Sequence, residues 1–335
     1  MRRRGVTVLL GAVITALLSI GVLGAPIPYV VLGPGPTVDT LGSADGKQVI
    51  QISGVETSDS AGQLRLTTVG VQPDVSLLSA IAGWISDDEA VVPRETVYPP
   101  GRTSEEVEEQ NKQDFTRSQT SAEVAALQQL GLPLRVVVES VTPDGPSAGK
   151  LREGDVLESV DGAAITESAT LISAIQARPA GTGFTIGYTR DGTAGTAQVT
   201  SREQDGAPRI GLGVAEQPPF ELSIDLDNIG GPSAGLMFAL GIIDKLEPED
   251  ITGGKVIAGT GTIDDQGNVG AIGGIPQKLV GAKAAGADVF LVPADNCAEA
   301  VRTAQPDLPL LKVSTLSEAL NTLELLRSGG DPPRC

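Results

Sequence analysis

The sequence predicts an α+β protein whose two domains follow an apolar N-terminal segment. Three observations lead to this prediction. Short apolar segments with strand character are interspersed with longer segments in which apolar residues recur at helical spacing. The chain has 335 residues, of which 40% are hydrophobic, so it can form more than one core. An uncharged apolar run lies close to the N-terminus, directly after three arginines.

Composition excludes several classes of function. The formal net charge is −18, which argues against a nucleic-acid partner because phosphate binding needs a basic surface. The chain contains no histidine, which excludes Ser-His-Asp and Cys-His catalysis and argues against a zinc enzyme. We expect neither a metal nor another cofactor. Cys297 and Cys335 lack metal-type spacing, and the sequence leaves open whether they form a disulfide.

The N-terminal segment predicts a membrane anchor. Arg2, Arg3 and Arg4 precede an uncharged apolar run over residues 6–23, which is just long enough to span a bilayer. The arginines should remain cytoplasmic and place the folded domains on the extracytoplasmic side. A cleaved signal peptide is the alternative, but Pro26 directly after Ala25 fits a cleavage site poorly. We therefore expect a retained anchor over residues 1–25, followed by a stiff connector rich in Pro and Gly over residues 26–47.

Residues 48–131 contain structural elements but no evident chemistry. We expect strands over residues 49–52 and 64–69 and a short apolar helix over residues 76–85. Thr103 and Glu106 have the spacing of a capping box, which predicts a polar helix that ends at Gly131. The glutamates that follow Thr103 are interpreted as a solvated helix face.

Residues 132–203 carry a second type of pattern. A strand over residues 135–141 is followed by the run Gly-Asp-Val-Leu-Glu-Ser-Val-Asp-Gly at residues 154–162, then by a helix over 168–177 and a strand over 184–188. This order resembles a bacterial PDZ domain, a module that binds the carboxyl end of a peptide as an added strand. The apolar-Gly-apolar residues Leu130, Gly131 and Leu132 are a candidate for the loop that receives the peptide carboxylate, although simple core packing explains them equally well.

The five residues Gly-Pro-Ser-Ala-Gly occur twice, at 145–149 and at 231–235. Ser147 lies in a turn with no long apolar helix after it, and we interpret it as structural. Ser233 follows Pro232, which suits the first position of a helix, and a long apolar helix comes after it. Free backbone N–H groups at such a helix start favour a nucleophile whose substrate develops an oxyanion. Taken alone, Ser233 is better interpreted as the N-cap of a tightly packed helix.

A lysine occupies a similar place on a second helix. Lys278 lies two residues after Pro276, in the first turn of a predicted helix with apolar neighbours. The positive end of a helix dipole and burial both favour the neutral amine, which is the form that can act as a base. An exposed helix lysine, as expected for Lys283, is the alternative, and periodicity alone does not decide between them.

The combination of motifs resembles the proteolytic domain of Lon proteases. It consists of Gly-Pro-Ser-Ala-Gly at 231–235, Thr-Gly-Thr-Ile at 260–263 and Ile-Gly-Gly-Ile-Pro-Gln-Lys-Leu at 272–279, and it continues to about residue 325. The resemblance implies a catalytic dyad of Ser233 and Lys278, with Thr260 bonded to the lysine. Gly230 departs from the family, which often has an acidic residue there. With the anchor and the PDZ module, the chain resembles the membrane-anchored PDZ–Lon-type proteases.

The resemblance also implies an architecture. Residues 204–328 are short for a complete Lon-type domain, so we expect residues 48–131 to complete it, the PDZ module over 132–203 to be an insertion, and 329–335 to be a tail. No Gly-x-x-x-x-Gly-Lys-Ser/Thr motif occurs, so cleavage should be independent of ATP and act on unfolded segments or C-terminal tails. A homo-oligomeric ring is implied by the resemblance only.

Two other functions fit parts of the sequence. The protein could be an anchored PDZ scaffold with an inactive Lon-like domain. Residues 230–235 could instead be the phosphate-binding loop of a small-molecule kinase. The pairing of Thr260 with Lys278 and the expected extracytoplasmic location argue against the kinase.

Overall fold

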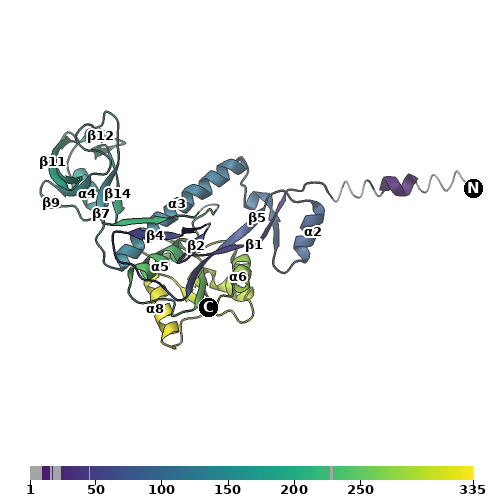
Figure 1. The fold of residues 1–335 in the computed structure, drawn as a ribbon. Helices are drawn as coiled ribbons and strands as arrows, with labels where there is room; N and C mark the ends of the chain where they lie inside the picture. The colour runs from purple at the N-terminus through teal and green to yellow at the C-terminus, as the bar shows by residue number, and fades with distance from the viewer. Residues whose placement is uncertain (1–9, 16, 18–23, 45, 227–228) are drawn as a thin grey trace, which may run out of the picture. The chain divides into compact units, whose positions relative to one another are not determined.

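A computed structural model describes the chain except for residues 1–9, 16, 18–23, 45 and 227–228. The chain forms two compact units (Figure 1). The first comprises residues 1–50, 57–122 and 224–335, and the second comprises residues 51–56 and 123–223. The second unit is thus inserted between segments of the first. The expected anchor over residues 6–23 falls mostly outside the described residues. Within the described part of the chain, no helix has the length and apolarity needed to cross a membrane.

The first unit is built on a six-stranded mixed sheet, in the order β20-β19-β16-β5-β1-β6. Strands β5, β16, β19 and β20 run parallel to one another, whereas β1 is antiparallel to both β5 and β6. β5 precedes the inserted unit in the chain and pairs with β16, which follows it. The strands are β1 (Tyr29–Asp39), β5 (Gln63–Gln72), β6 (Ala90–Pro93), β16 (Val256–Gly259), β19 (Val289–Pro293) and β20 (Leu310–Val313).

Helices of the first unit arise where the sequence places apolar residues at helical spacing. The predicted capping box is present, because Thr103 Oγ1 accepts the N–H of Glu106 at 3.2 Å and the Glu106 carboxylate accepts the N–H of Thr103 at 2.8 Å. The helices are α2 (Leu77–Ile85), α3 (Ser104–Gln129, which continues into the second unit), α5 (Gly235–Leu246), α6 (Ile275–Ala284), α7 (Cys297–Arg302) and α8 (Leu316–Arg327), with 3-10 turns η1 (Arg94–Thr96) and η2 (Ala294–Asn296). Two small hairpins join β2 (Ser43–Ala44) to β3 (Lys47–Gln48) and β17 (Thr262–Ile263) to β18 (Val269–Gly270).

The expectation of a stiff connector over residues 26–47 is wrong. Most of its first half is β1, an interior strand of the sheet in which Val30 and Val31 are buried. The two prolines of β1, Pro34 and Pro36, lie at a shift in register between Pro34 and Thr37. Proline is tolerated there because no ladder hydrogen bond is lost. The density of Pro and Gly therefore marked an irregular strand and not a linker.

The second unit contains a sheet in the order β11-β10-β8-β7-β14, with β9 paired to β8. Its apolar core includes Val136, Leu157, Phe184 and Ile186. The unit continues to residue 223, beyond the expected boundary at 203, because β14 pairs with β7. Its elements are β7 (Arg135–Val141), β8 (Val156–Val160), β9 (Ala163–Ala164), α4 (Ser168–Gln176), β10 (Gly183–Arg190), β11 (Thr193–Thr200), the hairpin β12 (Arg202–Gln204) and β13 (Ala207–Arg209), β14 (Leu212–Gln217), and the pair β4 (Ile50–Ser53) with β15 (Glu221–Ile224).

The C-terminal residues are part of the fold. A disulfide joins Cys297, at the start of α7, to Cys335. The tail follows strand β20, where Lys312 donates its N–H to the Pro333 carbonyl at 3.0 Å and Cys335 donates to the Leu310 carbonyl at 3.1 Å. The question that the sequence left open is thus answered by a cross-link that attaches the tail to the edge of the sheet.

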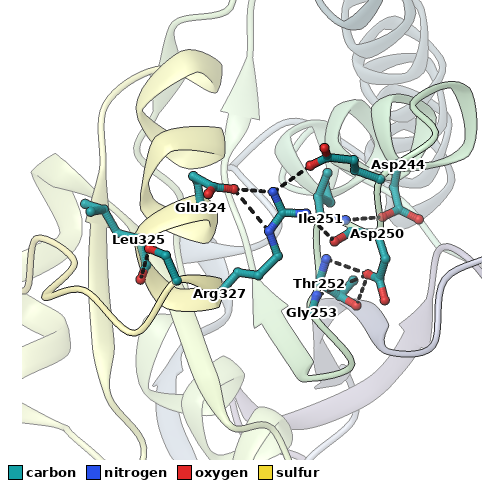
Figure 2. A network of polar contacts seen from close by, with 10 residues as sticks. Asp244, Asp250, Ile251, Thr252, Gly253, Glu324, Leu325 and Arg327 are labelled. Carbon is teal, nitrogen blue, oxygen red and sulfur yellow. Dashed lines mark hydrogen bonds and ion pairs between the residues drawn. The ribbon is translucent and has the colours of Figure 1, made fainter.

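A polar network connects the end of α5 to α8 (Figure 2). Asp244 is 1% exposed, and its carboxylate accepts hydrogen bonds from the Ser60 hydroxyl at 2.5 Å and the Ile251 N–H at 3.0 Å. Asp250 accepts the N–H groups of Thr252 and Gly253, and Arg327 contacts Glu324 and the Asp250 carbonyl. Burial raises the pKa of Asp244 above its ordinary value. These contacts fix the end of α5 farthest from Ser233.

Candidate active site

Ser233 lies in the turn that leads into α5. The proline pattern predicts that Ser233 lies in the first turn of this helix. The helix instead begins at Gly235, so Ser233 precedes it. The difference arises because Leu236 donates its N–H to the Gly261 carbonyl at 3.1 Å, and helical hydrogen bonding starts with Phe238 and Ala234. The half-buried Ser233 therefore remains at the positive end of α5, next to N–H groups that have no helical partner.

Helix α3 fixes the turn before Ser233. The Gly231 N–H donates to the Asn111 carbonyl at 2.8 Å, and the Ser118 hydroxyl donates to the Pro232 carbonyl at 3.0 Å. Gly235 must be glycine, because a Cβ atom there would lie 2.8 Å from both the Ser118 Oγ and a methyl group of Ile263. No residue type in α3 indicated a connection to the serine.

Lys278 is almost completely buried in the first turn of α6, with 3% of its surface exposed. Its Nζ lies 2.9 Å from Ser233 Oγ, 3.1 Å from Thr260 Oγ1 and 2.6 Å from the carbonyl oxygen of Thr67. Among the described residues, no ion pair is formed with a carboxylate here, and burial lowers the pKa of Lys278 from 10.5 to about 8. The exposed-lysine alternative is therefore wrong for Lys278.

Thr260 connects the Lys278 side chain to the Ser233 backbone. It is fully buried at the end of β16, where its hydroxyl donates to the Ser233 carbonyl at 3.0 Å while it accepts from Lys278 Nζ. The Gly261 N–H donates to the same Ser233 carbonyl at 2.9 Å. The structure thus brings together all three residues that the sequence pointed to.

Thr67 was missed by the sequence reasoning. Its carbonyl on β5 receives Lys278 Nζ, and its hydroxyl donates to the Gly259 carbonyl at 3.2 Å. A backbone acceptor leaves no signature in side-chain type, and Thr67 lies 211 positions before Lys278 in the chain. Only the pairing of β5 with β16 places it there.

A cleft of about 640 Å³ opens beside Ser233 and Lys278. One wall is the end of β5, including Val69 and Val71, and a second wall includes Ile272 and Gly273. Asn296 holds this second wall, because its side-chain amide accepts from the Ile272 N–H and donates to the Ile272 carbonyl, both at 2.9 Å. The cleft is large enough for several residues of an extended chain.

A second groove lies in the inserted unit, between α4 and the edge strand β14. It encloses about 230 Å³ and is lined by Leu171, Ile172, Ile175, Ile210, Leu212 and Val214, among others. The free edge of β14 offers backbone groups to an added strand. Ser147 supports this groove, since its buried hydroxyl donates to the Ile210 carbonyl at 2.7 Å, which agrees with the structural role predicted for it.

The loop over Leu130, Gly131 and Leu132 lies elsewhere. Gly131 has a φ of 65° and ends α3, with its N–H bonded to the Gln128 carbonyl and the Leu132 N–H bonded to the Leu127 carbonyl. Because these N–H groups are engaged, they are not free for a carboxylate. The same apolar-Gly-apolar pattern recurs at Ile210-Gly211-Leu212, which does line the groove, and this repetition was the missed signal.

Comparison with known proteins identifies both units. Residues 106–200 match the family profile of the PDZ domain, and residues 228–325 match that of the Lon protease (S16) C-terminal proteolytic domain. These matches define a class of protein that combines a peptide-binding module with a Lon-type proteolytic domain. The chain therefore carries a PDZ domain and a Lon-type proteolytic domain, which is the domain combination of PDZ–Lon-type proteases.

Individual relatives match only parts of the chain. Lon protease 1 of Sorangium cellulosum (strain So ce56) is 39% identical over 101 residues, which is 29% of this chain. The chain spans 12% of the length of that relative. Solved PDZ domains of SdrC-like proteins from Listeria monocytogenes and Listeria innocua are 30% and 29% identical. Each covers 24% of this chain, the match includes 85% and 92% of the respective domain, and both TM-scores are 0.23.

Proposed function

We propose that the protein is an ATP-independent serine endopeptidase in which Ser233 and Lys278 form the catalytic dyad. One observation carries the proposal: the nearly buried Lys278 places Nζ 2.9 Å from Ser233 Oγ, without a carboxylate partner among the described residues. A lysine with a pKa of about 8 is partly neutral at physiological pH and can therefore accept a proton.

The reaction follows from this geometry. Neutral Lys278 removes the Ser233 proton while Oγ attacks a peptide carbonyl carbon, and N–H groups at the start of α5 stabilise the oxyanion. The C–N bond then breaks as Lys278 returns the proton to the leaving amine. Water attacks the resulting ester, again with Lys278 as base, and releases the acid. Thr260 and the Thr67 carbonyl keep Nζ directed at Oγ throughout these steps.

The substrates are unfolded segments of proteins or peptides, because the chain has no motif for ATP-driven unfolding. The groove between α4 and β14 binds their carboxyl ends and raises their concentration near the cleft. Residues 6–23 anchor the protein in the membrane, with both units on the extracytoplasmic side. The disulfide between Cys297 and Cys335 supports an extracytoplasmic placement, since disulfides persist in oxidising compartments. A homo-oligomeric ring is part of the proposal by family resemblance.

A fluorophosphonate probe is expected to label Ser233, with a rate that rises about tenfold per pH unit below pH 8 and levels off above it. The reason is that the reactive form requires neutral Lys278, whose pKa is about 8. Peptide mass spectrometry identifies the labelled serine and gel fluorescence gives the rate. Label on a different serine, or no label at all, would favour the inactive-scaffold alternative. A rate that is constant between pH 6 and 9 would exclude Lys278 as the base.

The PDZ groove is tested separately. We expect Ile172→Asp to weaken binding of a fluorescent peptide with a free apolar C-terminal residue by at least about tenfold, because the charge enters an apolar groove. Ile172 is 46% exposed, so the fold should be unaffected. Fluorescence anisotropy measures the affinity, and Val301→Asp, at an exposed valine on α7, is the matched control. Equal affinity for the amidated form of the peptide would contradict capture of the carboxyl end.

A further inference from the structure

Helix α2 carries its large apolar side chains on the outside. Leu78, Ile81, Trp84 and Ile85 are 59%, 37%, 58% and 78% exposed. The buried positions of the helix are instead the small residues Ala80 and Gly83. A surface helix normally has the opposite arrangement, with its large apolar residues in the core. No charged residue occurs within α2.

The packing of α2 prevents it from turning these side chains inward. Ala80 lies in a small core with Val31 and Val75. A Cβ atom on Gly83 would lie 3.0 Å from a methyl group of Val91 and 3.4 Å from one of Val31. Because only small residues fit on this side, the four large apolar side chains, which share a face by their spacing, form a permanent surface stripe.

The N-terminal end of α2 lies where the chain arrives from residues 6–23. Pro26 forms a bridge with Ser76, the cap of α2, and the Ile27 N–H donates to the Val75 carbonyl at 3.0 Å. Position 23 is three residues before Pro26, a stretch that spans at most about 11 Å, and Pro26 pairs directly with the cap of α2. If residues 6–23 cross the bilayer, α2 must lie at its surface.

The chemistry of the stripe fits that position. Trp84 contacts Tyr29 edge to face, with ring centroids 6.2 Å apart, and both residue types concentrate at membrane–water interfaces. Asp87, Asp88 and Glu89 follow Ser86, the C-cap of the helix, which keeps this end of α2 at the water boundary and disfavours anionic lipid.

We propose that the exposed face of α2 lies in the membrane interface, with Leu78, Ile81, Trp84 and Ile85 among the head groups and upper acyl chains of neutral lipid. This rests on the membrane anchoring proposed above. It also restricts the substrates. Val71, at the rim of the cleft, is six positions from Leu77 and thus within about 20 Å of it. The cleft is held near the bilayer, where membrane-proximal segments of other proteins are the accessible substrates.

Trp84 provides the test, because it is the only tryptophan in the sequence. The full chain is reconstituted into phosphatidylcholine vesicles, and flotation measures its association with them. We expect the Trp84 emission to shift to shorter wavelength and to be quenched by phosphatidylcholine brominated near the head group. Quenching by aqueous iodide should be at least about threefold weaker than for free tryptophan in the same buffer.

A triple variant, Leu78→Ser, Ile81→Ser and Ile85→Ser, keeps the reporter and removes the rest of the stripe. It should float and melt like the wild type, but quenching by brominated lipid should fall at least about threefold. The matched control, Ile172→Ser with Val301→Ser, changes exposed apolar residues elsewhere and should leave quenching unchanged.

Several results would overturn the proposal. The first is a chain that floats while iodide quenches Trp84 as strongly as free tryptophan. The second is protection of Trp84 from iodide without quenching by brominated lipid. That second result would mean that another protein copy covers α2. A chain that does not float would remove the anchor and the proposal together. None of these measurements uses peptidase activity, so failure of the Ser233–Lys278 dyad leaves the test valid.

Discussion

Ser233→Ala is expected to lower kcat/KM for a short unstructured peptide by about 10⁴-fold or more, because no other group can form the acyl-enzyme. The hydroxyl that is lost contacts Lys278 Nζ, while the Ser233 backbone carbonyl keeps its hydrogen bonds to Thr260 and Gly261. The fold should therefore remain intact. Release of a fluorophore from a quenched peptide measures the loss, and circular dichroism shows whether the variant is folded.

Ser147→Ala is the matched control, since Ser147 stands in an identical five-residue run. Its hydroxyl bonds the Ile210 carbonyl in the inserted unit and does not line the cleft. Cleavage of a short peptide, which needs no PDZ groove, should continue at close to the wild-type rate. The dyad is wrong if Ser233→Ala retains cleavage, and the assignment of the two serines is reversed if only Ser147→Ala loses it.

Much of the site could be predicted from the sequence because its chemistry depends on residue type. The absence of histidine, two helices predicted to start with proline, and Thr260 pointed to Ser233 and Lys278. The structure places Lys278 Nζ within hydrogen-bond distance of the hydroxyl groups of both Ser233 and Thr260. What the sequence did not reveal depends on backbone geometry. The Thr67 carbonyl and the α3 contacts to Gly231 and Pro232 exist only because distant strands and helices pack together.

The errors in the fold have a related cause. Pro34 and Pro36 indicated a connector, yet a shift in register lets β1 accept them inside a sheet. The pattern Leu130-Gly131-Leu132 indicated a carboxylate-binding loop, yet glycine there ends α3, and the equivalent pattern around Gly211 lines the groove. Local composition correctly predicted an irregular backbone at these positions. It could not predict which strand or helix would pack against that backbone.

Lys278→Met is expected to abolish peptide cleavage to the same extent as Ser233→Ala, and the double variant should be no less active than either single one. A base and its nucleophile act as a unit, so their effects do not add. Peptide cleavage by all three variants measures this. If the loss of activity in the double variant equalled the sum, in free energy, of the losses in the two single variants, it would contradict a shared proton transfer.

Lys278→Met should also reveal how much folding free energy is lost by burying the lysine. The folded-state pKa is lowered from 10.5 to about 8, so folding releases a proton between these values. The cost is absent above pH 10.5, grows as pH falls, and is complete below about pH 8, where it amounts to about 3 kcal/mol. Relative to the methionine variant, the wild type should therefore gain about this much stability between pH 7 and pH 10.5. Urea unfolding of both proteins at several pH values measures the difference. A pH-independent difference for Lys278→Met would mean that the amine titrates normally, and the chemistry proposed for it would then lose its physical basis.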